Sequence, residues 1–97
     1  MNIQLKKFGT TLISRQAGRE AFNAFQSTLT EIKEGEGLMI DFDGVITFSP
    51  SWGDEFLTPL LKQFNDKLIL THVANPSVQA SLHLLMRINK QKFTFGD

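Results

Sequence analysis

The hydrophobic positions in the N-terminal third of the chain predict two short strands and one helix. Apolar residues between 3 and 8 predict a first strand that ends near the following glycine, and residues 12–13 predict a short second strand. Ser14 is a suitable N-cap, because its hydroxyl can accept a hydrogen bond from an unpaired N–H of the first helical turn. From residue 17 to residue 32 the apolar positions have helical spacing. Gly18 weakens that helix, and the close approach of a strand would explain its presence.

A second strand–helix unit occupies the middle of the chain. Residues 38–40 form a short continuous apolar run, which is typical of a buried strand, and residues 45–48 continue it after a turn. Pro50, flanked by two serines, predicts the start of the next helix. The apolar face of that helix comprises Trp52, Phe56, Leu57, Leu60, Leu61 and Phe64. Pro59 cannot donate a backbone hydrogen bond, so we expect a kink or a restart of the helix there.

The C-terminal third predicts one further strand and helix. Residues 67–73 read as a buried strand, and Asn75-Pro76 is typical of a helix start. The resulting order, ββαβαβα, predicts an α/β fold in which a small, largely parallel or mixed β-sheet is covered by helices. We expect a single domain over residues 1–97, with residues 90–97 forming either a loose tail or a C-terminal edge strand.

The composition narrows the range of functions. The 97 residues contain no cysteine, which excludes disulfides and thiolate metal sites. Ten basic residues balance ten acidic ones, so we expect no nucleic-acid partner. No apolar run approaches the roughly 20 residues of a membrane span, and the first residues lack the apolar stretch of a secretory signal. We therefore expect a cytoplasmic protein that does not contact the membrane.

Charge is unevenly distributed along the chain. Residues 38–66 contain five acidic residues and one basic residue, whereas residues 67–97 contain four basic residues and one acidic residue. His72 and His83 are isolated and lack the spacing of metal ligands, so we interpret them as ordinary core-edge or surface groups. The sequence thus predicts neither a metal nor a cofactor.

An apolar strand that runs into Asp41-Phe42-Asp43-Gly44 resembles the first motif of haloacid-dehalogenase-type phosphatases. The resemblance implies that Asp41 is a nucleophile and Asp43 a general acid/base, with magnesium bound nearby. Such enzymes need a later acidic pair to complete the magnesium site, but Asp97 is the only acidic residue after Thr71. This phosphatase is therefore the less favoured alternative, and turn formation at a strand end is the simpler role for both aspartates.

Residues 11–17 (Thr-Leu-Ile-Ser-Arg-Gln-Ala), 38–45 and 51–57 form three motifs in a fixed order. They resemble, in turn, the helix entry L-I-S-R-x-x-A, the strand hydrophobic-D-F-x-G-V and the helix start S-F-A-D-E-L of the STAS-like domains of unknown function. That family belongs to the STAS superfamily and is related to bacterial anti-sigma factor antagonists. The third motif departs from the pattern in having Trp52 and Gly53.

The resemblance implies the STAS fold and a signalling or interaction module that is not an enzyme. Anti-sigma factor antagonists bind a histidine-kinase-like ATPase, which phosphorylates a serine at the start of the helix after the central strand and so weakens the complex. By this resemblance the chain is a partner-switching module, and its partner is such an ATPase. The implied docking and regulatory residues are Arg15, Asp41, Asp43, Ser49, Ser51, Trp52, Asp54 and Glu55.

The phosphoacceptor is ambiguous, because the position of the antagonists' phosphorylated serine falls on Pro50, which has no hydroxyl. Ser51 and Ser49 flank it and are the candidate acceptors. Ser51-x-x-Asp54 is also a capping-box pattern, and capping is the favoured role of Ser51. A turn or cap role is likewise favoured for Ser49.

The roles of Arg15 and Trp52 each have two possible interpretations, and a third class of function is also open. Arg15 is either a plain exposed helix residue or the source of a salt bridge or partner contact. Trp52 is spaced to pack in the core with Phe56, and an interface anchor is its alternative role. A structural homo-oligomer that pairs edge-to-edge through residues 91–97 is the third class of function.

Overall fold

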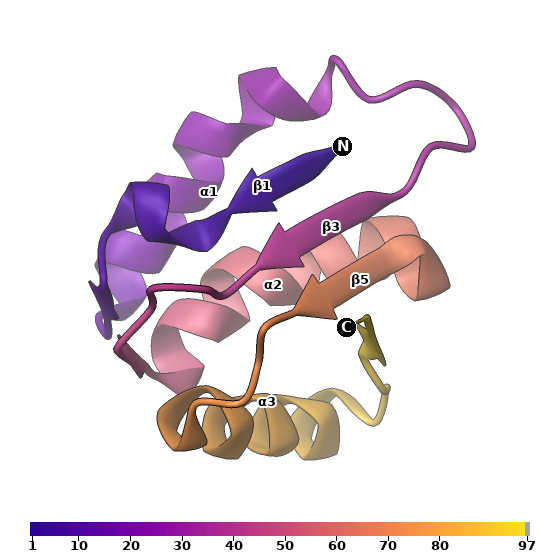
Figure 1. Ribbon diagram of the computed structural model, residues 1–97. Coiled ribbons are helices and arrows are strands. Elements are labelled where there is room, and N and C mark those ends of the chain that lie inside the picture. Colours follow the sequence, from indigo (N-terminus) through magenta and orange to yellow (C-terminus); the bar gives the residue numbers. More distant parts are fainter. Residues whose placement is uncertain (97) are drawn as a thin grey trace.

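The strands and helices follow the predicted order, except that residues 47–48 form a separate strand between the central strand and the second helix. A computed structural model describes residues 1–96, and Figure 1 shows its strands and helices. The strands are β1 (Asn2–Gln4), β2 (Thr11–Leu12), β3 (Leu38–Asp41), β4 (Thr47–Phe48), β5 (Leu68–Thr71) and β6 (Thr94–Phe95). The helices are α1 (Arg15–Leu29), α2 (Pro50–Phe64) and α3 (Pro76–Asn89), with short 3-10 helices η1 (Leu5–Phe8) and η2 (Asn65–Lys67). The predicted α/β fold is confirmed.

All the strand pairs are parallel. The main sheet has the order β1-β3-β5-β6, and β2 and β4 form a separate two-stranded sheet. The sequence had left a largely parallel or a mixed sheet open, and the mixed arrangement is not the one observed. Of the two alternatives for the C-terminal residues, the structure has the edge strand, because β6 pairs with β5.

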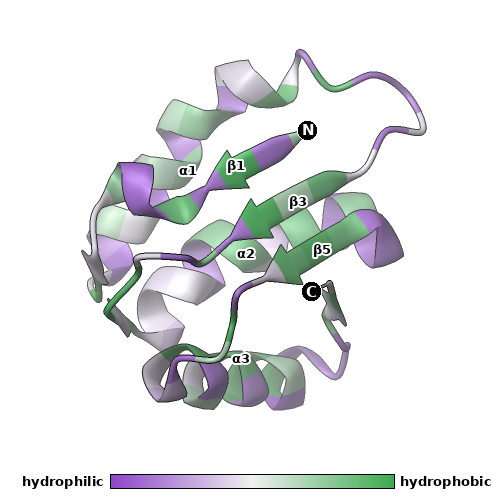
Figure 2. Cartoon of the chain, in the orientation of Figure 1, coloured by the Kyte–Doolittle hydropathy of each residue, from purple (hydrophilic) through white to green (hydrophobic). Residues whose placement is uncertain are grey.

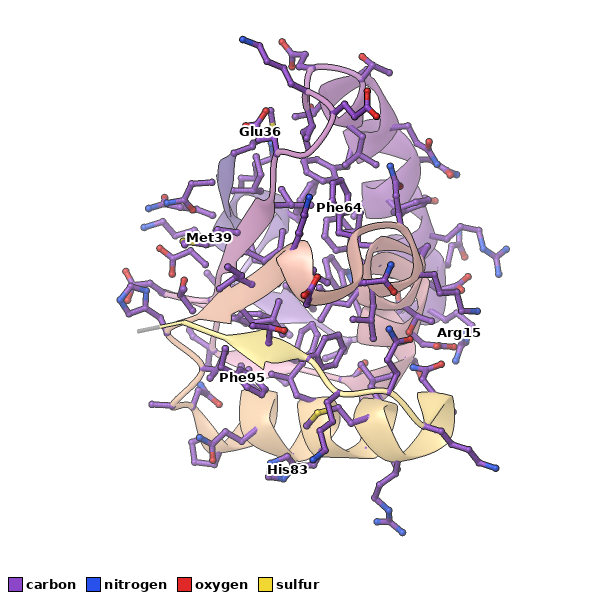
Figure 3. All side chains as sticks on the ribbon, turned by 90° about the vertical axis from the view of Figure 1, so that its right-hand side faces the viewer. Arg15, Glu36, Met39, Phe64, His83 and Phe95 are labelled. Atoms are coloured by element: carbon purple, nitrogen blue, oxygen red, sulfur yellow. The ribbon has the colours of Figure 1, made fainter. Side chains whose placement is uncertain are left out.

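Helices α1 and α2 cover one face of the main sheet, and α3 runs beside its β5–β6 side (Figure 1). Strands β3 and β5 are apolar along most of their length (Figure 2). Their alternate residues point into the core, whereas Met39 and Ile69 point to the face that no helix covers and are only half-buried. Met39 and Arg15 accordingly lie on opposite sides of the molecule (Figure 3).

Two predicted elements end earlier than the apolar pattern indicated. The first strand stops at Gln4, because residues 5–8 form the 3-10 helix η1, in which Leu5 is fully buried. Residues at i and i+3 lie on the same side of a 3-10 helix, so a spacing of three also fits this structure. Helix α1 ends at Leu29, and Ile32 packs against the core from a following turn.

Helix α2 runs without a restart through Pro59. The proline leaves one carbonyl of the preceding turn without its helical hydrogen bond. The restart capped by Thr58 is therefore not observed, and the hydroxyl of Thr58 donates instead to Oδ1 of Asp54 at 3.0 Å.

Aromatic side chains fill the space between α1, α2 and the sheet. Trp52 stacks on Phe56 with ring centroids 5.0 Å apart, and Phe25 lies 5.5 Å from the same ring. Phe48 meets Trp52 at 5.9 Å, which connects this group to β4. Aromatic pairs at these distances contribute about 0.5–1.5 kcal/mol beyond the area they bury.

At Gly18 the backbone of α1 closely approaches the backbone of α2. A Cβ atom at Gly18 would lie 2.6 Å from the carbonyl oxygen of Trp52 and 3.0 Å from its Cα. The close approach expected from the sequence is therefore real, but the neighbour is a helix and not a strand. Only glycine allows the two backbones to come this close.

The substitution Gly18→Ala tests this contact, because the contact determines whether the free energy of unfolding rises or falls. Helix propensity alone would raise the free energy of unfolding by up to about 1 kcal/mol. Because the new methyl group collides with backbone rather than with a flexible side chain, we expect a net loss of about 1–3 kcal/mol. Urea unfolding of Gly18→Ala and of the exposed α1 variant Asn23→Ala measures the difference. A stabilised Gly18→Ala protein would contradict the contact.

Candidate functional site

One end of the molecule collects the carboxyl ends of the parallel strands and the N-termini of all three helices (Figure 1). In open parallel α/β sheets ligands bind at the carboxyl ends of the strands, and functional residues are often found on the loops that a rigid scaffold positions there. Asp41 is the last residue of β3, Asp43 lies in the loop that follows it, and Ser49 directly precedes α2. The structure therefore brings these three predicted site residues to the same end.

Asp41 is a largely enclosed carboxylate at the end of β3. Its side chain is 13% exposed, and its Oδ1 accepts a hydrogen bond from the N–H of Asp43 at 2.8 Å. Burial raises the pKa of Asp41, but the N–H of Asp43, the ring of His72 and the charge of Lys6 outweigh it, so the pKa lies below its usual value. Asp41 is thus a carboxylate near neutral pH, and Asp43, whose side chain is exposed, shapes the turn through its backbone.

His72 completes this group, although no sequence pattern connects it with Asp41. It directly follows Thr71, which is the register partner of Asp41 in the β3–β5 pair. Its Nδ1 lies 2.7 Å from Oδ1 of Asp41, and its φ of 55° is in the left-handed region. His72 was interpreted from the sequence as an ordinary core-edge or surface group. That interpretation did not include the pairing with Asp41, because the two residues are 31 positions apart.

Side chains of α3 fix the position of β4 and hence the start of α2. The hydroxyl of Ser81 donates to the carbonyl of Phe48 at 2.6 Å, and the N–H of Phe48 donates to the hydroxyl of Ser77 at 3.1 Å. The amide of Asn75 donates to the carbonyls of Val45 and Ile46. The loop between β3 and α2 is therefore held by hydrogen bonds from a distant part of the chain.

Ser49, and not Ser51, is the N-cap of α2. Its Oγ accepts from the N–H of Trp52 at 3.2 Å and donates to the carbonyl of Ile13 at 2.6 Å. The capping box predicted for Ser51 and Asp54 is wrong, because the helix begins two residues earlier than a cap at Ser51 would place it, with Pro50 in its first turn. Ser51 lies within the first turn and is half-buried.

Two arginines of α1 pair with two acidic residues of α2. Nη1 of Arg15 lies 3.0 Å from Asp54 and 3.4 Å from Glu55, and Nε of Arg19 lies 2.8 Å from Glu55. Of the roles considered for Arg15, the salt bridge is the one observed. Asp54 and Glu55 are correspondingly paired within the chain, and an exposed ion pair of this kind is worth about 0–1 kcal/mol.

Trp52 belongs to the core and is 1% exposed. It therefore does not lie on the surface that a partner would contact. The large apolar side chains that are exposed at this end are Ile13 (52%) and Ile46 (64%). Neither was predicted as a site residue, because Ile13 was assigned to a strand and Ile46 to an apolar run.

Within residues 1–96 no three histidine, aspartate or glutamate side chains lie close enough together to hold a metal ion. The same residues include no helix long and apolar enough to cross a membrane.

A family model described as "STAS-like domain of unknown function (DUF4325)" matches residues 25–78, which is more than half of the chain. The chain belongs to this STAS-like family. The match runs from the second half of α1 to the start of α3 and includes Asp41, His72 and Ser51. No curated protein and no solved structure matches the chain.

The two serines beside Pro50 are expected to differ in their contribution to stability. Ser49→Ala removes the cap and the bond to Ile13, and loss of an N-cap costs about 0.5–2 kcal/mol. Ser51→Ala removes no hydrogen bond seen in the structure and is expected to change the free energy of unfolding by less than about 0.5 kcal/mol. Thermal and urea unfolding of the two variants provide the comparison. Equal effects would contradict the assignment of the cap to Ser49.

The ionised state of Asp41 predicts a pH dependence of stability. Because the pKa of Asp41 is lower in the folded protein than in the unfolded chain, its contribution is fully present at neutral pH. It is lost as the pH falls from about 5 toward the folded-state pKa. We expect the free energy of unfolding to fall less steeply over this range in Asp41→Asn than in the wild type. The exposed Asp43→Asn serves as the control, and identical slopes for wild type and Asp41→Asn would refute the prediction.

Proposed function

We propose that this STAS-like domain is a non-enzymatic cytoplasmic interaction module that docks on a histidine-kinase-like ATPase in a bacterial partner-switching system. The docking surface comprises Ile13, Ile46, Ser51 and the turn after β3. The observation that carries the proposal is the exposed pair Ile13 and Ile46, which flanks a helix start held by hydrogen bonds.

This surface is preorganised. The carbonyl of Ile13 accepts from the Ser49 hydroxyl, and the carbonyl of Ile46 accepts from the amide of Asn75. Each isoleucine thus projects from a backbone that is already fixed. A partner that covers them gains apolar burial at a small cost in loop entropy.

Within this surface, Ser51 is the residue whose hydroxyl group is the proposed phosphate acceptor. Ser49 uses its oxygen as the helix cap and its hydrogen for Ile13, so modification there would break both bonds. A phosphate on Ser51 would lie in the first turn of α2, where the unpaired N–H groups and the helix dipole favour negative charge. It would leave the helix folded and add about two negative charges to the docking surface.

Binding to the ATPase encoded nearest to this gene tests the proposal. We expect Ile13→Glu to weaken the complex by tenfold or more, about 1.4 kcal/mol, because it places a charge within an apolar contact. Ile88→Glu is the matched control, since Ile88 is 62% exposed but lies on α3 near its C-terminal end. Isothermal titration calorimetry with ATP and with ADP measures both variants.

The variant Ser51→Asp addresses regulation in the same assay. A weaker complex for Ser51→Asp supports phosphorylation as the switch. If the wild type fails to bind the ATPase in either nucleotide state, the proposal is refuted. If Ile13→Glu and Ile88→Glu have equal effects, the docking surface has been placed wrongly.

A further inference from the structure

The pair Asp41–His72 serves no purpose in the docking proposal, yet it has the geometry of a carboxylate that orients a histidine. The side chain of His72 is 58% exposed, whereas that of Asp41 is 13% exposed. The carboxylate is therefore enclosed while the imidazole faces solvent. Neither residue belongs to the apolar core, so packing does not explain the arrangement.

The hydrogen bond determines which nitrogen of the ring carries the proton. An ionised carboxylate only accepts hydrogen bonds, so Nδ1 of His72, at 2.7 Å from Asp41 Oδ1, is the protonated nitrogen. In the neutral imidazole the lone pair then resides on Nε2. The negative charge on Asp41 also stabilises any positive charge that develops on the ring when Nε2 reacts.

The backbone at His72 indicates that this orientation is specified. Its φ of 55° lies in the left-handed region, which costs a residue with a Cβ atom about 1–2 kcal/mol. The preceding residue, Thr71, is held by the β3–β5 pairing, and its carbonyl accepts from the N–H of Phe42 at 2.9 Å. Unfavourable backbone angles of this kind gather at functional sites, where the surrounding structure holds a side chain in place.

We propose that Nε2 of His72 is a phosphoryl acceptor in this protein. The choice of a phosphoryl group rests on the proposed function, in which a kinase-type ATPase docks at this end of the sheet. Ser51 is the hydroxyl acceptor of that proposal, Ser49 is engaged on both sides, and His72 is a second, separate acceptor. His72 offers a lone pair at the same end without any change in the fold.

In the reaction, the Nε2 lone pair attacks the terminal phosphorus of an activated donor such as ATP. An N–P bond forms, and the P–O bond to the leaving group breaks with its electron pair, which releases ADP. The Nδ1 proton stays between the ring and Asp41, and the ring becomes a cation that Asp41 neutralises. Lys6, whose positive charge contributes to the lowered pKa of Asp41, helps to keep this carboxylate ionised.

Phosphoramidate, a small donor that phosphorylates imidazole directly, tests the site without any partner protein. Here the P–N bond of the donor breaks and ammonia leaves. The intact protein is incubated at neutral pH, and modified peptides are mapped by mass spectrometry under alkaline conditions, because N–P bonds are labile to acid. His83, on the exposed surface of α3 (Figure 3), is an internal control that has no hydrogen bond to a carboxylate.

We expect His72 to be labelled at least about tenfold faster than His83, by analogy with the loss of about 10–100-fold when the hydrogen-bond partner of a metal-ligating histidine is removed. Asp41→Asn should reduce the rate at His72 to that at His83 and leave His83 unchanged. His72→Gln should abolish the fast reaction.

Equal labelling of the two histidines in the wild type would overturn the proposal, as would a His72 rate that Asp41→Asn does not lower. Circular dichroism verifies that the Asp41→Asn variant is folded. If the variant is unfolded, the proposal is tested by the labelling rates of His72 and His83 in the wild-type protein alone. An unreactive His72 in a protein that still binds its ATPase would refute this site and leave the docking proposal intact.

Discussion

The contact between Gly18 and the backbone of Trp52 is the constraint on which the rest of the structure depends. It sets the distance between α1 and α2, and these two helices enclose the aromatic core against the sheet. The same approach brings the arginines of α1 within reach of Asp54 and Glu55. A larger residue at position 18 would separate both the buried and the charged contacts, so the absence of a side chain there sets the spacing of α1 and α2.

The sequence predicted best those features that depend on neighbouring residues. Ser14 and Asn75 cap their helices as expected, because a side chain and an N–H two or three residues away are sufficient. The choice between Ser49 and Ser51 could not be made in this way. Both flank Pro50, and the carbonyl of Ile13, which is 36 positions away, favours Ser49.

The candidate site was predictable only in its location. Alternating strands and helices placed Asp41 at the carboxyl end of a buried strand, where the structure has it. Its partner His72 could not be inferred, because that pairing depends on the register of β3 against β5 and on a left-handed residue after Thr71. The role of Trp52 was open for a similar reason, since helical spacing shows which side of a helix a residue occupies but not what covers that side.

Strand β6 has a consequence for the behaviour of the protein in solution. It pairs through two residues, and the absence of a side chain at Gly96 allows the backbone of that residue to lie against Ile69 and Thr71. A strand this short is held by few hydrogen bonds, and such segments open locally at a free energy far below that of global unfolding. Each opening exposes the edge of β5, a buried apolar strand of the type that pairs readily with other chains. The pairing of β6 with β5 therefore covers this edge for most of the time. It limits how often the β5 edges of two molecules are both free to pair.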